Sequence, residues 1–594
     1  MTEDFDVIVI GGGPAGSTVA GFLNQMGHRV LLLERETFPR HHIGESMIAA
    51  TIDILAEIGL EEKLAAANFP VKSGGCFLWG QSPDPWCIRF EEIPGRPTSY
   101  QVKRSVFDKI LLDHAAECGV DVRQGHRVTD VLMEDGRVTG VKFTDAQGDG
   151  HTATARYTVD ASGLAAVIAN RLSRRVPVEE LKNMCLYGYW AGAHPAPAAL
   201  GGEIRPNDRN NIIIKMLPDG WLWFIPLGNP GTAGGDQLEI SVGFVAPRKN
   251  LPESGGKPAL ESFYLDHVRS TAEWKYLLQD ATYTGDFHTI KDWSYRSDEM
   301  AGPGFFTTGD ASCFVDPILS SGVFLGVLYA KMCAIGLHTL LTTTAPEPLI
   351  HEWYQGLYLD TYSDYLEMAR YWYHGHREVA MWMDQAQEQL GEEEEPVFAD
   401  TNRDAFIALA TGNTHAHPNY VVLRQLESFP LPLHLRKDPR SHYLKEAQAA
   451  LLGHADSETA SENPKEAERS AQALAMPIEL RKRVLSMIRS EDQTVVARFS
   501  GNGHHALSPD AHVVVSPEAR LSLEAIDDVV TLVVRAPSGE RRAIEWDGER
   551  QLVAAFAEAT QLGSVEKRTG LAHEHVVSFC EEMVAAGVLV PAGS

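Results

Sequence analysis

The first forty residues contain two apolar runs separated by a glycine-rich turn. Residues 7–10 (VIVI) are β-branched, which predicts a buried parallel strand, and the residues after the turn have the apolar spacing of a helix. A second apolar run, residues 30–33, predicts the next strand and ends at Glu34. The pattern therefore predicts a strand, turn, helix and strand, the unit with which parallel sheets hold a dinucleotide.

The turn has the spacing Gly11-x-Gly13-x-x-Gly16. In this motif one glycine makes the turn, one lets the backbone approach a pyrophosphate, and one lets the helix pack closely on the strand, while the helix N-terminus faces the phosphates. Glu34 is placed to accept hydrogen bonds from a ribose hydroxyl. The alternative is a glycine-rich turn without a nucleotide, and the strand, helix and acid around the turn argue against it.

Two later segments are predicted to return to the same sheet. Strand-rich sequence over residues 120–159 ends in DASG, which contains Asp160 and Gly163. A strand over residues 305–308 leads into the turn GDA, which contains Asp310. Each segment brings a strand end and an acid to the nucleotide edge of the sheet.

Three further segments each allow two interpretations. Arg104, at the start of a predicted helix, could reach back to the nucleotide or be solvated. The apolar residues 318–341 are long enough for a membrane span, but Lys331 and His338 lie among them, so we predict a buried helix. Aromatic side chains over residues 348–373 could stack on a substrate, but their helical spacing is more typical of a core.

The charge of the chain narrows its range of partners. A net charge of −28 over 594 residues argues against nucleic acid. Residues 471–594 have a winged-helix-like order of helices and strands, a pattern often found in DNA-binding proteins. They carry 12 Lys and Arg against 17 Asp and Glu, however, which favours a protein contact or a lid.

The cysteines and the start of the chain bear on its location. Seven cysteines are scattered without a CxxC pair, which predicts neither a disulfide framework nor a zinc site and favours a reducing cytoplasm. A strand is predicted within a few residues of the start, so no signal peptide is expected.

In their order, the three nucleotide segments resemble the FAD-binding core of flavin monooxygenases of the aromatic-hydroxylase type. The resemblance implies an α/β fold with a Rossmann-type FAD-binding domain, an antiparallel-sheet substrate layer (about 71–100 and 185–290) and a C-terminal α+β winged-helix-like domain. The predicted domains are an FAD-binding and catalytic core (1–345), a helical extension (346–452), a linker (453–470) and the winged-helix-like domain (471–594). The residues implied in FAD binding are Gly11, Gly13, Pro14, Ala15, Gly16, Glu34, Arg35, Arg40, Ile43, Arg104, Asp160, Gly163, Asp310, Pro317, Gly322 and Val323.

Residues 220–226 read GWLWFIP and contain Trp221 and Trp223. The segment resembles the WxWxIP signature of flavin-dependent halogenases, a branch of the same superfamily in which it crowds the flavin and disfavours hydroxylation. Lys72 stands at the position of the family's essential lysine. The resemblance implies that reduced FAD, oxygen and chloride or bromide yield hypohalous acid, which Lys72 holds by a hydrogen bond or as a haloamine. Without these neighbouring motifs, two core tryptophans and a surface lysine would be the simpler interpretation.

The loop over residues 316–323, DPILSSGV, resembles the halide-binding loop of the family. By that match, Ser321 and Gly322 supply backbone N–H groups at the N-terminus of the apolar helix. The segment FPRHHIGES resembles the part of the family that covers the flavin, which makes Glu45 and Ser46 candidate catalytic residues.

The predicted function is a two-component, FAD-dependent halogenase of secondary metabolism. Leu319 stands where halogenases of free tryptophan carry a glutamate, so we expect a phenol, a pyrrole or a carrier-tethered acyl group as substrate. The single Rossmann fingerprint is assigned to FAD, which implies that a separate flavin reductase supplies reduced flavin. In length and appended tail the chain most resembles the halogenase of chloramphenicol biosynthesis and its relatives.

Two alternative functions use the same nucleotide segments. An FAD-dependent aromatic hydroxylase (monooxygenase) would share all three of them, but GWLWFIP together with Lys72 favours halogenation. A flavin-loaded binding protein would act through the C-terminal tail, whose acidic balance argues against DNA. No metal, nucleic acid or membrane is expected as a partner.

Overall fold

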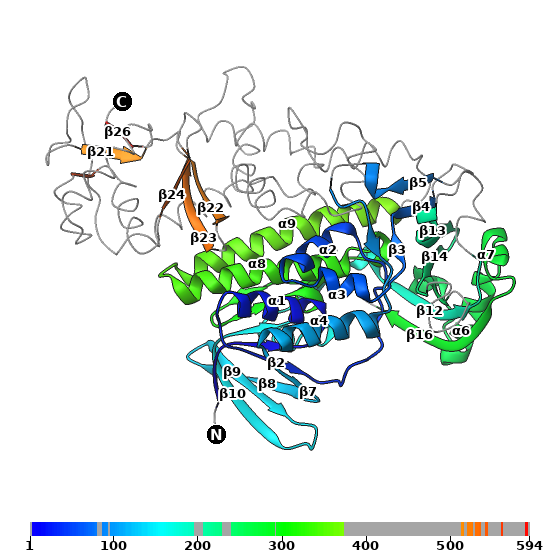
Figure 1. The fold of residues 1–594 in the computed structure, drawn as a ribbon, viewed down its shortest axis with the longest axis horizontal. Helices are drawn as coiled ribbons and strands as arrows, with labels where there is room; N and C mark the ends of the chain where they lie inside the picture. The colour runs from blue at the N-terminus through cyan, green and yellow to red at the C-terminus, as the bar shows by residue number, and fades with distance from the viewer. Residues whose placement is uncertain are drawn as a thin grey trace. The chain divides into compact units, whose positions relative to one another are not determined.

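The computed structural model describes residues 3–79, 86–92, 95–194, 206–228, 239–291 and 293–373, together with six short strands between residues 512 and 591 (Figure 1). The chain divides into two compact units, one of residues 1–337 and 354–420 and the other of residues 338–353 and 421–594. The first unit contains two large sheets, the three nucleotide segments, GWLWFIP and Lys72.

The first sheet has eight strands and is built on the predicted strand, helix and strand unit. Its order is β18-β19-β10-β1-β2-β7, with β9 and β8 added beside β10, and its central strands β19, β10, β1, β2 and β7 run parallel. Such strands are buried on both faces, which explains the continuous apolar runs at residues 7–10 and 30–33. The strands are β1 Glu3–Ile10, β2 Val30–Glu34, β7 Asp121–Gln124, β8 Arg127–Glu134, β9 Arg137–Thr144, β10 Gly150–Asp160, β18 Ala301–Gly302 and β19 Phe305–Thr307.

The three nucleotide segments meet where the parallel strands of this sheet have their carboxyl ends, which we call its nucleotide edge. Asp160, the last residue of β10, lies opposite Ile10 of β1 on one side and Thr307 of β19 on the other. The turns that follow these parallel strands therefore converge, as the sequence predicted.

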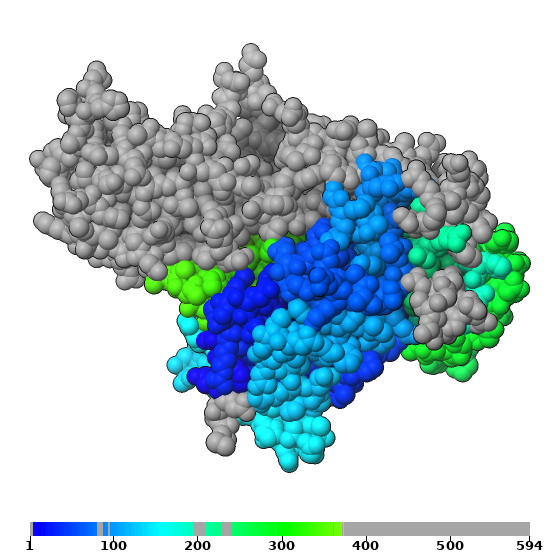
Figure 2. All heavy atoms as spheres, viewed as in Figure 1, coloured from blue at the N-terminus to red at the C-terminus, as the bar shows by residue number. Residues whose placement is uncertain are grey.

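Helices cover one face of the first sheet, and β8 and β9 pack against the other face. α1 (Pro14–Gln25) and α4 (Arg104–Cys118) pack against each other and against β1, β2 and β7. Together with α2 (Ala49–Glu57) and α3 (Glu61–Ala66), they form the blue part of the face seen in Figure 2. The helices α5 Ala169–Leu172, α6 Gly256–Val268 and α7 Ala272–Leu277 follow later in the unit.

Two long helices, α8 (Gly322–Thr342) and α9 (Glu347–Tyr373), run side by side (Figure 1). The rings of Tyr329 and Tyr358 stack between them with centroids 3.9 Å apart. α8 is long and apolar enough to cross a membrane, but 89% of its most apolar stretch is buried within the protein, so the predicted buried helix is confirmed. Tyr354, Tyr358 and Tyr365 of α9 are also buried, as predicted for a core.

The second sheet has seven strands in the order β16-β12-β15-β14-β13-β4-β5 and is antiparallel except between β13 and β4. GWLWFIP forms β14 near its centre. Leu222 and Phe224 pack into the core beneath α6 and α7, whereas the intervening Trp221 and Trp223 face the opposite side, as the two-residue period of a strand requires. The strands are β4 Gly74–Leu78, β5 Trp86–Arg89, β12 Asn183–Ala191, β13 Ile212–Leu217, β14 Gly220–Pro226, β15 Glu239–Pro247 and β16 Thr282–Lys291.

The described part of the first unit also contains two small sheets. β3 pairs with β6, and β17 pairs with β11 and β20. Their bounds are β3 Val71–Lys72, β6 Ser99–Tyr100, β11 Arg175–Pro177, β17 Tyr295–Ser297 and β20 Cys313–Phe314.

A disulfide links Cys76 of β4 to Cys87 of β5, which corrects the expectation from the sequence. The two cysteines are directly opposite each other in the antiparallel pair, with Cα atoms 4.1 Å apart. Pairing depends on the register of two strands, and their spacing along the chain did not reveal it. The prediction of no disulfide was therefore wrong, and the cysteines no longer favour a reducing compartment.

The C-terminal part is described only as strands. β21 pairs with β25 and β26, while β22, β23 and β24 form a meander. The predicted linker and most of the helices of the winged-helix-like domain lie outside the described residues, and the helical extension is described as far as Tyr373. The strands are β21 His512–Val515, β22 Arg520–Ile526, β23 Val529–Arg535, β24 Arg541–Ile544, β25 Thr560–Gln561 and β26 Leu589–Pro591.

Candidate active site

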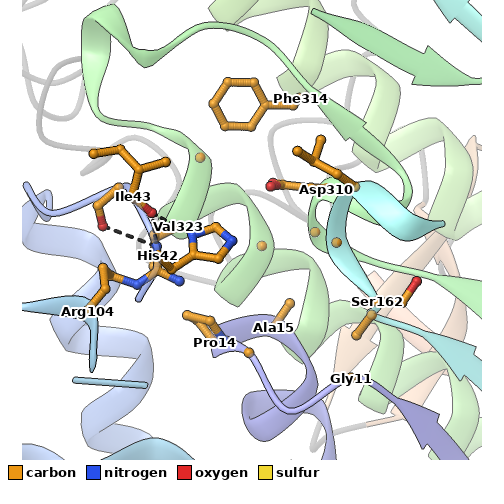
Figure 3. A pocket seen from close by; sticks show the side chains of 18 of the residues that line it. Gly11, Pro14, Ala15, His42, Ile43, Arg104, Ser162, Asp310, Phe314 and Val323 are labelled. Atoms are coloured by element: carbon orange, nitrogen blue, oxygen red, sulfur yellow. Dashed lines mark hydrogen bonds between the residues drawn. The ribbon is translucent and has the colours of Figure 1, made fainter. Parts of the chain in front are cut away.

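A cavity of about 660 Å³ lies where the nucleotide edge of the first sheet faces β14 of the second. In Figure 3, Arg104 and Ile43 lie on one side of it, and Asp310 and Ser162 lie on the other. Most residues that the sequence assigned to the site line this cavity. They are Gly11, Gly13, Pro14, Ala15, Glu34, Arg35, Arg40, Ile43, Glu45, Ser46, Arg104, Gly163, Trp221, Trp223, Asp310, Pro317, Gly322 and Val323.

Two residues assigned to the nucleotide site act behind its surface. A Cβ at Gly16 would lie 1.9 Å from the carbonyl oxygen of Gly11, so this glycine allows α1 to pack closely on the turn. Asp160 is fully buried and accepts hydrogen bonds from the backbone N–H groups of Ser162 and Ile168, at 3.0 and 2.7 Å. It therefore orders the DASG turn beneath the cavity.

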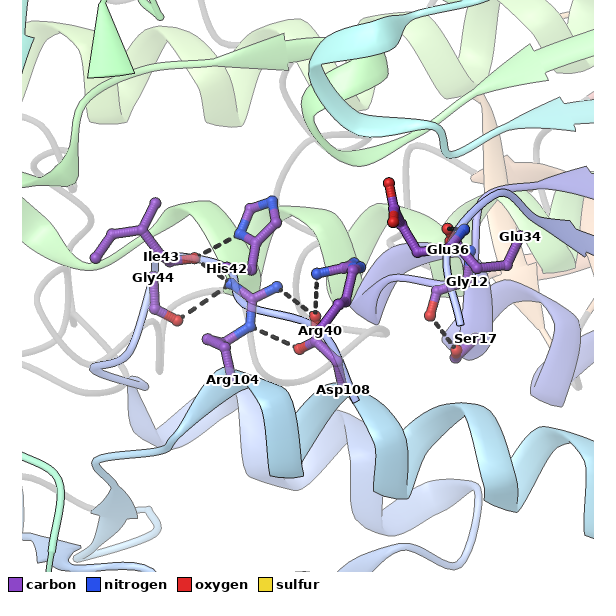
Figure 4. Close-up of polar contacts among 10 residues, drawn as sticks. All are labelled: Gly12, Ser17, Glu34, Glu36, Arg40, His42, Ile43, Gly44, Arg104 and Asp108. Carbon is purple, nitrogen blue, oxygen red and sulfur yellow. Dashed lines mark hydrogen bonds and ion pairs between the residues drawn. The ribbon is translucent and has the colours of Figure 1, made fainter. Parts of the chain in front are cut away.

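The glycine-rich turn and Glu34 form one end of the cavity. Gly11 has a φ of +101°, which favours glycine, and α1 begins after Gly13 without a side-chain cap, so its first N–H groups are open to a ligand. Glu34 accepts hydrogen bonds from the N–H groups of Gly12 and Glu36, at 2.6 and 2.8 Å (Figure 4). Free N–H groups at a helix N-terminus beside a fixed carboxylate fit the pyrophosphate and ribose of FAD.

A buried charge network holds the segment that borders the cavity. Arg104 is only 4% exposed, and its Nε and Nη2 donate to Asp108 at 2.6 and 2.9 Å, so the solvated alternative was wrong. Its Nη1 donates to the carbonyl oxygens of Ile43 and Gly44, and Arg40 Nη1 lies 3.2 Å from Asp108 (Figure 4). Asp108 was missed in the sequence, although it lies one helical turn after Arg104 on α4.

The loop before α8 has a tight backbone. Asp316 accepts a hydrogen bond from the N–H of Ile318 at 3.1 Å, and Ser320 adopts a φ of +57°. Ser321 is buried but does not line the cavity, whereas Ser320 and Gly322 do. A Cβ at Gly322 would lie 2.5 Å from the ring of Phe314, so only glycine fits where α8 begins.

Glu45 and Ser46 are both buried at the cavity wall. Burial raises the pKa of Glu45 to about 7, and its Oε1 accepts a hydrogen bond from the Tyr189 hydroxyl at 2.9 Å. Ser46 pairs with Gln101 as an isolated bridge. Tyr189 was not assigned to the site from the sequence, since it comes from β12 of the other sheet.

Lys72 lies on β3 and is 4% exposed, so it is no surface lysine. Its Nζ lies 5.5 Å from the centre of the Phe90 ring, and burial lowers its pKa to about 7. The residues that line the described cavity do not include it. Near neutral pH the lysine is therefore present in both its amine and its ammonium form. It is buried outside the set of residues that line the cavity.

The two tryptophans of β14 are fixed by hydrogen bonds to other elements. Trp221 Nε1 donates to the hydroxyl of Tyr373 at 3.0 Å, and Trp223 Nε1 donates to the hydroxyl of Ser241 at 3.2 Å. Their rings lie 5.8 Å apart and both line the cavity. They form a rigid indole wall opposite the nucleotide edge.

Comparison with known proteins identifies the family. A family model described as FAD binding domain matches residues 4–355. The tryptophan 2-halogenase of Chondromyces crocatus is 31% identical over 415 residues, which cover 68% of this chain and 75% of that protein. The solved myxobacterial chondrochloren halogenase CndH is 34% identical, with a TM-score of 0.58, over 69% of this chain and 97% of its own.

A further solved structure, the flavin-dependent halogenase CmlS, matches the fold over all of this chain and 96% of its own, with a TM-score of 0.57 and 24% identity. The predicted aromatic-hydroxylase-type α/β fold and the FAD cofactor are thereby confirmed. Members of the family use reduced flavin, supplied by a reductase, to halogenate a small molecule. The chain belongs to the flavin-dependent halogenases.

Proposed function

We propose that the enzyme delivers hypohalous acid from the flavin cavity, by way of Lys72, to an electron-rich or activated carbon of a secondary-metabolite intermediate. The observation that carries this assignment is a lysine that is 4% exposed and whose pKa burial lowers to about 7. Because burial favours the neutral amine of Lys72, its lone pair is available to react with an electrophile.

The chemistry of Lys72 balances without a further reagent. FAD, when bound, supplies the two-electron oxidation of chloride or bromide by oxygen. Hypohalous acid then reacts with the neutral amine of Lys72 to give a haloamine and water, or is held by hydrogen bonds from the ammonium. The substrate carbon takes the halogen, loses its proton, and leaves the amine restored. A pKa near 7 keeps both forms of Lys72 available.

Other residues would bind the FAD and the halide. The turn containing Gly11 and Gly13 would hold the pyrophosphate, and Glu34 would hold the ribose. The N–H groups of Ser321 and Gly322, at the N-terminus of the 21-residue helix α8, would hold the halide.

The substrate class rests on the same loop. Leu319 is buried and apolar, so this position offers no carboxylate to orient an indole. We therefore favour a phenol, a pyrrole or an acyl group tethered to a carrier protein. The relative from Chondromyces is named for tryptophan, which makes tryptophan a necessary member of the test panel.

A single-turnover assay tests this function. The FAD-loaded enzyme is reduced, mixed with oxygen and either chloride or bromide, and given phenols, pyrroles, acyl-carrier substrates and tryptophan. We expect a product with the mass of the added halogen that is absent without halide. A hydroxylated product that does not depend on halide would contradict the proposal.

A further inference from the structure

A chain of hydrogen bonds runs from the solvent to the wall of the cavity. His41 Nε2 lies 2.8 Å from the hydroxyl of Tyr189, and that hydroxyl donates to Glu45 Oε1 at 2.9 Å. His41 is exposed and, like Glu45, lines the cavity, whereas Tyr189 and Glu45 are buried. We propose that His41 and Tyr189 conduct a proton from solvent to Glu45, which delivers it into the cavity for halide oxidation. This inference rests on the proposed function.

The relay is held in place from two sheets. His41 follows β2, and its ring stacks on His288 of β16 with centroids 4.2 Å apart and an angle of 10°. Tyr189 projects from β12, the strand that pairs with β16. Tyr187, two residues before Tyr189, lies opposite His288 and stacks against it. The imidazole is thus fixed with Nε2 facing Tyr189.

The carboxyl group of Glu45, which receives the proton, has one oxygen without a hydrogen-bond partner among the described residues. Glu45 is 3% exposed, and its Oε2 is buried without a hydrogen-bond donor in ordinary geometry among the described residues. The hydroxyl of Ser241 lies beside this carboxyl and is itself fixed by Trp223 Nε1 at 3.2 Å. Because Glu45 lines the cavity, its unused oxygen is placed to exchange a proton there.

Burial and nearby charges shift the pKa values at both ends of the relay. Burial, His288, Arg104 and Arg40 lower the pKa of His41, while Asp286 opposes them. Burial raises the pKa of Glu45 to about 7. The hydrogen bond from Tyr189, the nearby hydroxyl of Ser241 and the charge of Arg104 lower it, while Glu239 adds to the rise. A carboxyl that titrates near 7 accepts and releases a proton with similar ease.

Halide oxidation requires such a supply. One halide ion, one oxygen molecule, the two hydrogens of reduced FAD and one proton yield hypohalous acid, oxidised FAD and water. One proton is therefore taken up in each turnover. It binds at Nδ1 of His41, the Nε2 proton passes to the Tyr189 oxygen, and the Tyr189 proton passes to Glu45 Oε1. Rotation of the carboxyl group about its Cγ–Cδ bond then turns the protonated oxygen toward the cavity, where Glu45 releases the proton.

The first test needs no turnover. Infrared difference spectra of the oxidised holoenzyme identify the carboxyl band of Glu45 as the one lost in Glu45→Gln, and mixing with heavy water follows its deuteration. Tyr189→Phe should slow this exchange by roughly 10-fold or more, because phenylalanine carries no proton. Tyr187→Phe, the matched control on the same strand, should leave it unchanged. Equal exchange in the two variants would overturn the relay.

The second test uses the halide-dependent oxidation of reduced FAD. Tyr189→Phe and Glu45→Gln should slow it roughly 100-fold, as expected when a general acid is lost. His41→Ala should slow it about 10-fold or more and recover with added imidazole, which a merely structural histidine would not do. If the wild type halogenates and Tyr189→Phe oxidises reduced FAD at the same rate as the wild type, the relay is overturned but the proposed function is not. A wild type that never halogenates would overturn the proposed function.

Discussion

Trp221 and Tyr373, 152 residues apart in the sequence, are joined by a hydrogen bond of 3.0 Å from the indole Nε1 to the phenol oxygen. The Tyr373 hydroxyl in turn donates to Asp316 Oδ2 at 2.9 Å. The last residue of α9 therefore ties β14 of the second sheet to the loop from which α8 begins. The wall of the cavity and the proposed halide loop share one polar connection.

Removing this connection should weaken the fold around the cavity. In Tyr373→Phe, the buried N–H of Trp221 and the carboxylate of Asp316 each lose a partner, and we expect a loss of about 1–3 kcal/mol in the free energy of unfolding. Burial already raises the pKa of Asp316 to about 6, and it should rise further. Denaturant unfolding of the holoenzyme measures the effect. Tyr362→Phe is the control, since the buried Tyr362 hydroxyl has no hydrogen-bond partner within the described part of α9 and its surroundings. Equal losses in the two variants would refute the connection.

Asp108 should support FAD binding from beneath the cavity. It is fully buried between Arg104 and Arg40, so Asp108→Asn leaves two cations without their counter-charge and should cost about 3–5 kcal/mol. We expect weaker FAD binding as well, because Arg104 holds the backbone of Ile43 and Gly44. Fluorescence titration with FAD and denaturant unfolding provide the two measurements. Asp113→Asn breaks an exposed pair with Lys109 on the same helix and should change stability by less than about 1 kcal/mol. Unchanged FAD affinity in Asp108→Asn would contradict this role.

Gly243 should be required by the ring of Trp223. A Cβ at this position would lie 2.3 Å from Cζ2 of the indole, so Gly243→Ala must displace the ring that lines the cavity. We expect a loss of about 1–3 kcal/mol and a changed tryptophan fluorescence spectrum. Gly356→Ala, in the open on α9, should be neutral or stabilising by up to about 1 kcal/mol. An undisturbed spectrum in Gly243→Ala would show that the ring is not held there.

The buried amine of Lys72 should reduce stability at neutral pH. Burial lowers its pKa from 10.5 to about 7, so between these values the unfolded chain binds a proton that the folded chain does not. The contribution of this group to the free energy of unfolding therefore rises with pH across that window, by at most about 1.4 kcal/mol per pH unit. Lys72→Met removes it. The variant should be more stable than wild type at pH 7, and the difference should shrink as the pH approaches 10.5. A difference that is constant over this range would contradict the buried, shifted amine.

Local sequence patterns predicted the nucleotide edge because it is built from local signals. The turn at Gly11, the strand end at Asp160 and the turn at Asp310 each follow an apolar run, and parallel pairing then brings them together. GWLWFIP could be recognised as a motif, although only the structure shows that its tryptophans face the cavity.

Contacts between distant strands and helices could not be predicted in this way. Tyr189, on a strand of the second sheet, donates a hydrogen bond to Glu45. Tyr373 donates one to Asp316 from the end of α9, a helix whose aromatic spacing predicted only core packing. The disulfide of Cys76 depends on strand register, which spacing alone does not fix.

The most direct test of the account compares halogenation with flavin oxidation in Lys72→Ala. Reduced holoenzyme is mixed with oxygen and halide, and three quantities are followed: oxidised FAD, halogenated product and hypohalous acid captured by a probe in solution. We predict flavin oxidation at the wild-type rate, loss of product, and free hypohalous acid, with Lys109→Ala behaving as wild type. Product formation that survives in Lys72→Ala would contradict the central role of this lysine.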